Sequence, residues 1–328
     1  MLVEPRFDNF SYSFSGHETF PLRYAWLSKA VQHLQSSRDL FLRDDALVTL
    51  GVGKNMVSAI RHWSRVLGIT EQKNGADKVS DLGERLFAEE GWDPYLEDPG
   101  TLWLLHWQLV SKPEKASTWF LAFTQWNRAS FTRDELVDWL VRQAASQPGT
   151  RATRSSIKRD AEVFIRTYVP SAATATRPPE ETFDSPLVEL GLLREVGRDV
   201  YEFVRGPKST LPDEILIFSL LSYWNIVAPE QQTLSLENLL HGRGSPGAAF
   251  KLSENALVER LERLPAWTKM RFDDTAGMRQ LLRQTGDGFA PKGTRPEGFD
   301  PMAALEHYYD AAVEGFAPKR TRPEGSAS

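Results

Sequence analysis

The chain has 328 residues, of which 41% are hydrophobic and 25% charged, and its formal net charge is −5. This length favours two or three domains, and the acidic balance excludes a uniformly basic nucleic-acid coat, so any contact with DNA must come from a local patch. The absence of cysteine excludes disulfides and thiolate metal sites. Without an apolar run of membrane-spanning length or a secretion signal, we expect a cytoplasmic protein that does not cross a membrane.

The first clear pattern in the chain is a pair of short helices separated by a glycine-containing break. Asp44 or Asp45 can cap a helix through Leu50, and Gly51 suits the left-handed conformation that follows a helix end. The next helix begins at Lys54, with an apolar face opposite a polar one. The polar face is expected to contact DNA through Lys54, Asn55, Ser58, Arg61 and Arg65.

A two-stranded hairpin is predicted directly after these helices. Asn74-Gly75 is a strong hairpin signal between a strand over residues 68–72 and a return strand near residues 78–79. Helix-turn-helix followed by a hairpin is typical of a winged helix, in which the hairpin would add Lys73 and Lys78 to the DNA-binding face. Between Lys54 and Lys78, five basic residues oppose two acidic ones, a local net charge of +3. The alternative is a solvated basic face on a winged helix that binds protein.

The glycines before Lys54 also raise the alternative of a phosphate-binding P-loop. That motif has the pattern G-x-x-x-x-G-K-(S/T). It requires Ser or Thr directly after the lysine, and a first glycine five positions before the second. Here Asn55 follows the lysine and Val48 occupies the earlier position, so the residues favour the helix-turn-helix.

A second winged-helix-like unit is predicted downstream of a tryptophan-rich region. Residues 101–128 resemble buried helices, and a capping box of Thr132 and Glu135 begins a further helix. The following helix, with an apolar face that includes Ile157 and Phe164, precedes a strand over residues 200–204. Its basic side chains add three expected DNA contacts, which are Arg154, Lys158 and Arg159.

The last third of the chain is expected to be mainly helical. Residues 213–227 are strongly apolar and must be buried against another domain or another subunit, and residues 267–272 predict a strand. The overall prediction is a mostly α-helical protein with small β-hairpins, built of tandem winged-helix units plus a C-terminal helical region. The predicted domains are residues 1–100, 101–210 and 211–328, the last with a repeated basic tail.

That tail repeats the segment GFAPKGTRPEG, residues 288–298, as GFAPKRTRPEG, residues 315–325. Pro and Gly make both copies poor candidates for regular structure. A local duplication is the simpler interpretation, and a basic arm that touches DNA phosphates is the alternative.

Two N-terminal stretches carry a family resemblance. FSGHETFPLRYAWLSKA, residues 14–30, and DDALVTLGVGKNMVSAIRHW, residues 44–63, closely resemble the SspB-like family, a domain of unknown function associated with bacterial DNA phosphorothioation and defence. The resemblance implies a DNA-acting protein that nicks one strand so that sulfur can enter the backbone. It also implies partners, namely a cysteine desulfurase, an ATPase and an ATP-pyrophosphatase-like sulfur-transfer protein.

The residues themselves contain no familiar nuclease motif. The best local candidate for a catalytic group is His17 and Glu18 with Arg23, since a histidine can act as a base, a glutamate can hold Mg²⁺ or Mn²⁺, and an arginine can clamp phosphate. The alternative is that His17 bonds to the domain core while Glu18 and Arg23 pair at the surface. The metal ligands are unknown at this stage.

Three functions remain open from the sequence. The first is a DNA-nicking or DNA-binding component of a phosphorothioation system, and the second is a non-enzymatic adaptor that links DNA to the sulfur-transfer and ATPase partners. The third is a transcriptional regulator, which would need a symmetric dimer. A homodimer is expected, with the apolar segment ILIFSLLSYW, residues 215–224, as a possible subunit face.

Overall fold

The computed structural model describes residues 10–171, 184–275, 277–284 and 300–316, and both repeated tail segments lie outside them except for Gly315 and Phe316. The chain is mostly helical, with one two-stranded and two three-stranded antiparallel sheets among the described residues, as the sequence predicts at this level. No described helix is long and apolar enough to cross a membrane.

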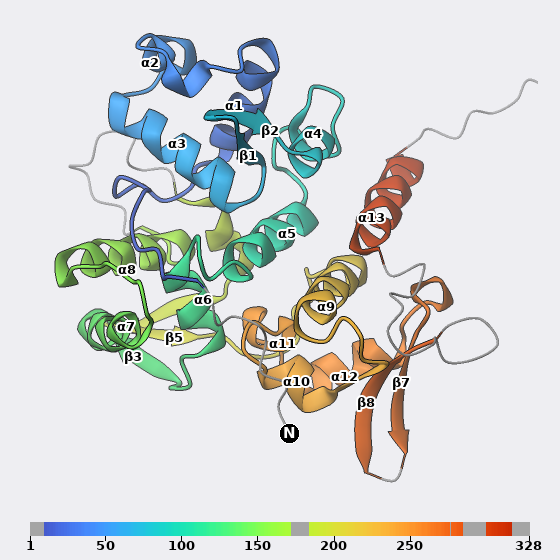
Figure 1. Ribbon diagram of the computed structural model, residues 1–328. Helices are drawn as coiled ribbons and strands as arrows, with labels where there is room; N and C mark the ends of the chain where they lie inside the picture. Colours follow the sequence, from blue (N-terminus) through green and yellow to red (C-terminus); the bar gives the residue numbers. More distant parts are fainter. Residues whose placement is uncertain (1–9, 172–183, 276, 285–299, 317–328) are drawn as a thin grey trace, which may run out of the picture.

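The first unit, residues 24–87, is a group of helices followed by a hairpin (Figure 1). Gly51 ends α2 at φ 65°, and α3 begins at Lys54, which confirms both predictions. Asn74 at φ 54° and Gly75 at φ 84° form the two-residue turn of the hairpin. The elements are α1 Tyr24–Ser36, η1 Leu40–Leu42, α2 Ala46–Leu50, α3 Lys54–Val66, β1 Thr70–Lys73, β2 Ala76–Val79 and α4 Asp81–Phe87.

The second unit, residues 99–203, adds a third strand to its hairpin. β3 pairs with β5, and β5 pairs with β4, so the strand order is β3-β5-β4. The predicted capping box of Thr132 and Glu135 is present at the start of α7, and the predicted apolar face of α8 is buried. The elements are α5 Pro99–Val110, α6 Ser117–Thr124, β3 Ser130–Thr132, α7 Arg133–Ser146, α8 Arg154–Tyr168, η3 Pro186–Leu190, β4 Leu193–Gly197 and β5 Val200–Phe203.

The third unit, residues 213–283, has the same arrangement, with strand order β6-β8-β7. The predicted strand over residues 267–272 is wrong in its first part, because Ala266–Thr268 form a 3-10 turn after Pro265 and the strand starts at Met270. The elements are α9 Asp213–Val227, β6 Thr233–Ser235, α10 Leu236–His241, α11 Pro246–Ala249, α12 Glu254–Glu262, η4 Ala266–Thr268, β7 Met270–Thr275 and β8 Met278–Arg283, followed by α13 Pro301–Phe316.

The apolar helix α9 is buried inside this chain rather than against a second subunit. Its side chains Ile215, Leu220 and Trp224 are fully buried, and α13 packs along it. The helix therefore offers no free subunit face among the described residues, which removes the sequence argument for a homodimer.

One continuous hydrophobic core runs through all three units, from Tyr12 to Tyr309. The tryptophans of α5 and α6, including Trp103 and Trp119, are buried in it, so core packing is their role. The three units therefore share one core, and the predicted division of the chain into three domains stays a prediction.

Candidate nucleic-acid interface

Helix α3 presents the polar face that the sequence predicts. Ile60 and Trp63 are fully buried, whereas Lys54, Asn55 and Ser58 are exposed at the start of the helix. A helix with this division seats its apolar side on the core and leaves its N-terminal residues accessible to a ligand.

The two arginines of α3 are not free cations. Arg61 donates from Nε to Asp77 Oδ2 at 2.7 Å, and Arg65 donates to both carboxylate oxygens, with Nη2–Oδ2 at 3.0 Å. Asp77 lies on β2 and is 2% exposed. One buried carboxylate thus holds two guanidinium groups and ties the hairpin to α3. Two of the predicted contacts on the polar face of α3, Arg61 and Arg65, are therefore already paired within the protein. The local net charge of +3 already counts Asp77.

The remaining cations of this face are exposed. Lys54 stands at the start of α3, and Lys73 and Lys78 lie on the hairpin. Glu71 is directly opposite Lys78 in the strand register and offsets part of its charge. We call Lys54, Arg61, Arg65, Lys73 and Lys78 the α3–hairpin face.

Helix α8 is the last α-helix before the hairpin of the second unit, as α3 is in the first, although the 3-10 helix η3 lies between α8 and β4. Lys158 and Arg159 are exposed, and Arg154 forms an exposed ion pair with Asp138 at 2.5 Å. All three predicted contacts on α8 are therefore at the surface.

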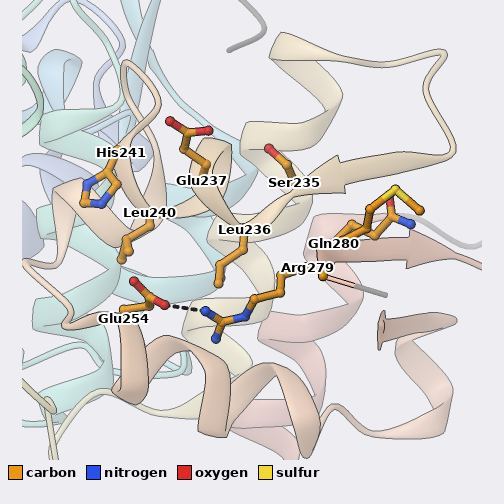
Figure 2. Close-up of a pocket in the computed structure, with 10 residues that line it drawn as sticks. Ser235, Leu236, Glu237, Leu240, His241, Glu254, Arg279 and Gln280 are labelled. Carbon is orange, nitrogen blue, oxygen red and sulfur yellow. Dashed lines mark hydrogen bonds and ion pairs between the residues drawn. The ribbon is translucent and has the colours of Figure 1, made fainter. Parts of the chain in front are cut away.

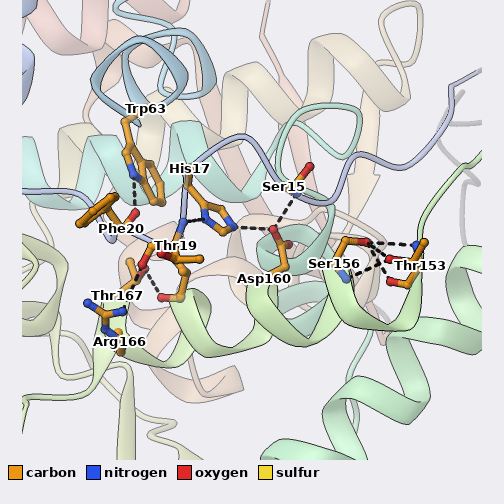
Figure 3. A network of polar contacts seen from close by, with 11 residues as sticks. Ser15, His17, Thr19, Phe20, Trp63, Thr153, Ser156, Asp160, Arg166 and Thr167 are labelled. Carbon is orange, nitrogen blue, oxygen red and sulfur yellow. Dashed lines mark hydrogen bonds and ion pairs between the residues drawn. The ribbon is translucent and has the colours of Figure 1, made fainter. Parts of the chain in front are cut away.

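The loop of residues 14–20 lies between α3 and α8 and is bonded to both (Figure 3). Trp63 of α3 donates to the carbonyl of Phe20 at 3.0 Å, and Arg166 of α8 donates to the carbonyl of Thr19 at 3.1 Å. The first family-like stretch thus joins the two helices that precede hairpins in the first and second units.

His17 is the buried centre of this loop. It is 2% exposed, and its Nε2 lies 2.7 Å from Oδ1 of the equally buried Asp160. The backbone N–H of Thr19 donates to His17 Nδ1 at 3.1 Å, so the ring proton sits on Nε2 and is donated to Asp160. Both ring nitrogens are engaged, which favours the structural alternative for His17.

The other two members of the predicted catalytic group have different surroundings. Glu18 is exposed, at the unusual φ of 49°, and Arg23 precedes α1 with its guanidinium near the Trp26 ring. The catalytic role of His17, Glu18 and Arg23 as one group stays untested, but the buried His17 and exposed Glu18 point into different environments.

His62 is a residue that the sequence analysis missed. It packs against Gly16, which has a φ of 107° that favours glycine. A Cβ atom at this position would lie only 2.4 Å from His62 Nδ1, so there is no room for a side chain. Burial and the nearby His17 lower the pKa of His62 to about 4, so it is neutral at pH 7. No local signal in the sequence connects Gly16, His62 and Asp160.

A pocket of about 670 Å³ lies between α1, α2 and the start of α3. Arg23, Tyr24 and Trp26 come from the first family-like stretch, and Gly53 and Met56 come from the second. The two stretches that carry the resemblance therefore form one cavity at the edge of the α3–hairpin face.

The comparisons with known proteins identify the family of the chain. The family model of a protein of unknown function, DUF4007, matches residues 14–290. The chain belongs to the DUF4007 family. Two solved SspB structures are similar to this DUF4007 protein at 32% sequence identity, one with a TM-score of 0.81 over 98% of this chain and 92% of that one. The other has a TM-score of 0.80 over 96% of this chain and 91% of that one. No curated protein matches the chain.

One of these two solved structures is a crystal structure of SspB with a bound magnesium ion. In this DUF4007 protein, the described residues contain no group of three or more His, Asp or Glu side chains placed to hold a metal ion. Mg²⁺ is usually held by one or two carboxylates together with water and phosphate oxygens, so the described residues are compatible with a site of that kind.

A second pocket, of about 620 Å³, lies in the third unit between α10, α12 and β8 (Figure 2). Arg279 bonds to Glu254 at its rim, and Glu237 and His241 project from α10. The lining is thus mixed in charge, in contrast to the pocket beside α1.

Proposed function

We propose that this SspB-like DUF4007 protein is the DNA-contacting component of a DNA phosphorothioation system. The observation that carries the proposal is the α3–hairpin face, a local charge of +3 on a chain of net charge −5. Such a distribution favours one binding orientation on a polyanion, because the rest of an acidic surface repels it.

The element order supports a tandem winged-helix architecture. The second and third units each contain helix, strand, helices and a hairpin, with the first strand paired to the last one of the unit. The first unit has the helices and the hairpin without the extra strand. In a winged helix, the helix before the hairpin enters the major groove with its N-terminal residues, and in the first unit that helix is α3.

Asp77 supports the same assignment. By holding Arg61 and Arg65 through a buried carboxylate, it fixes the orientation of the two guanidinium groups and of the hairpin relative to α3. A preorganised arginine loses less conformational entropy when it meets a phosphate than a free one does.

The test is a DNA-binding titration at several salt concentrations. We expect the triple variant Lys54→Gln, Lys73→Gln, Lys78→Gln to bind duplex DNA more weakly and with a shallower salt dependence, by about 0.9 logarithmic units per lost phosphate contact. The matched control removes three exposed cations of the third unit, with Arg263→Gln, Lys269→Gln and Arg271→Gln. Equal losses in both triple variants would contradict the assignment of the face.

Strand nicking is the finer part of the proposal. Glu18 and Arg23 are the members of the predicted catalytic group that a DNA strand can reach, whereas His17 holds the loop. The measurement is conversion of supercoiled plasmid to the open-circular form with Mg²⁺ or Mn²⁺. We expect Glu18→Gln to slow the conversion, and unchanged rates in this variant would remove Glu18 from the proposal.

An adaptor function is the second candidate, and the third unit favours it. Helix α12, which occupies the place of α3 and α8, exposes Glu254, Glu259 and Glu262 and therefore suits a protein partner better than DNA. A pulldown of the desulfurase, ATPase and sulfur-transfer proteins with a Glu259→Lys, Glu262→Lys variant tests it. Loss of a partner with retained DNA binding would support the adaptor function, and retention of every partner would contradict it.

A further inference from the structure

The pocket beside α1 has a lining that is basic and apolar. Arg23 and Lys29 supply two cations, and Tyr24, Trp26, Leu47 and Met56 supply aromatic and aliphatic surface. No carboxylate is among its described lining residues. Its volume of about 670 Å³ is within the usual range of a site for a small ligand. The occupant that complements these walls has a flat apolar part and a negative charge.

The apolar wall is accessible to such an occupant. Tyr24 is 38% exposed and Leu47 is 41% exposed, so both side chains present apolar surface to a ligand in the pocket. Lys29 is positioned by a hydrogen bond from its Nζ to the carbonyl of Leu50 at 3.1 Å, so its charge stays at the pocket.

Gly53 forms the opening of the pocket toward α3. Its φ of −68° is open to any residue, and a Cβ built there meets no described atom within 4 Å. Neither backbone conformation nor packing within the described chain therefore requires glycine. As the N-cap of α3, it leaves the first N–H groups without a side-chain cap, where Ser or Asp would add a few tenths of a kcal/mol. The missing side chain leaves the backbone at the start of α3 open to the close approach of a ligand.

We infer that this pocket receives one unpaired nucleotide of a DNA strand, with its base against Tyr24 and Leu47 and its phosphate near Lys54 and the start of α3. The inference rests on the proposed function, because the strand must already lie on the α3–hairpin face. An aromatic base fits the apolar wall, and the phosphodiester supplies the charge that Arg23 and Lys29 complement.

The experiment compares the affinity for a fully paired duplex with that for the same duplex carrying one bulged nucleotide. A base that is already unpaired avoids the cost of extrusion, so we expect the wild-type protein to bind the bulged duplex about ten-fold more tightly. Ala25→Trp fills the pocket from an exposed position of α1, and it should abolish this preference while the affinity for paired duplex is kept. The matched control is Gln32→Trp, an exposed position of α1 that does not line the pocket.

Gly53→Asp is the second variant. We expect it to fold normally, because aspartate is a favoured N-cap residue. We expect its melting temperature to hold or rise while the preference for the bulged duplex is lost through repulsion of the phosphate. A preference that survives in both Ala25→Trp and Gly53→Asp, or is missing from the wild type, would overturn the inference and leave the proposed function intact.

A third measurement, binding of a free deoxynucleoside monophosphate, distinguishes a nucleotide within a DNA strand from a free nucleotide. If the wild-type protein binds it in a manner blocked by Ala25→Trp but binds neither duplex, the pocket serves a free nucleotide, and both the strand assignment and the proposed function are wrong. If it binds neither the monophosphate nor the bulged duplex in preference to the paired one, the pocket is not a nucleotide site.

Discussion

His17 and Asp160 are 143 positions apart in the chain and meet through one buried hydrogen bond of 2.7 Å. Ser15 donates its backbone N–H to the same carboxylate oxygen at 2.9 Å. The loop that contains the first family-like stretch is thus anchored to α8 through the buried Asp160, in addition to the bond from Arg166 to the carbonyl of Thr19. Because α8 also packs in the second unit, this contact joins the first two units of the molecule.

We expect His17→Ala to destabilise the protein by about 3–5 kcal/mol, because it leaves a buried carboxylate without its main partner. Asp160→Ala should have a similar effect, and the double variant should cost less than the sum of the two. Chemical denaturation of the four proteins measures the coupling. Additive losses would show that the pair does not act as a unit.

The Asp77 carboxylate should matter more for stability than for charge. Asp77→Asn keeps the shape of the side chain but removes the anion that Arg61 and Arg65 share, so we expect a loss of about 1–3 kcal/mol. It should also weaken DNA binding, even though the local charge becomes more positive, because Arg61 and Arg65 lose the orientation that the shared carboxylate gives them. The control is Glu71→Gln, which removes one exposed acid from the same hairpin and should leave the melting temperature nearly unchanged.

Acid should destabilise the protein through His106. This side chain is fully buried, accepts a hydrogen bond at Nδ1 from Tyr168 and donates from Nε2 to the carbonyl of Ala249. Burial lowers its pKa to about 3, so between that value and the ordinary value of 6.5 the unfolded chain binds more protons than the folded one. Stability must therefore fall as the pH drops through this window.

From pH 6.5 to 5, the contribution of His106 is about 2 kcal/mol, at roughly 1.4 kcal/mol for each pH unit. The measurement is the free energy of unfolding at several pH values for the wild type and His106→Gln. The variant should be less stable at pH 7 but lose less on acidification, and an unchanged slope would show that another group dominates.

Helix α13 should stabilise the chain by covering α9. Leu305 is fully buried in the core, so Leu305→Ala is expected to cost about 2–5 kcal/mol. The neighbouring Glu306 forms only a surface ion pair with Arg85, so Glu306→Ala should cost less than about 1 kcal/mol. Thermal melts of the two variants test whether α13 is an integral part of the core.

Short-range features of this protein follow from its sequence alone. The left-handed Gly51, the Asn74-Gly75 turn and the capping box of Thr132 and Glu135 each depend on dihedral preferences or hydrogen bonds within a few residues. The helical periodicity of α3 and α8 likewise determines which of their faces is buried. Such features are legible in a single sequence because the interacting groups are covalent neighbours.

Only the tertiary structure decided how those elements use their charges and polar groups. It placed Asp77 between Arg61 and Arg65, enclosed His17 with Asp160, and covered α9 with α13 of the same chain. It also brought Tyr24 and Gly53 to the same pocket. The physical reason is that a partner's identity depends on which distant segments pack together, and neither the charge nor the polarity of a side chain specifies that partner.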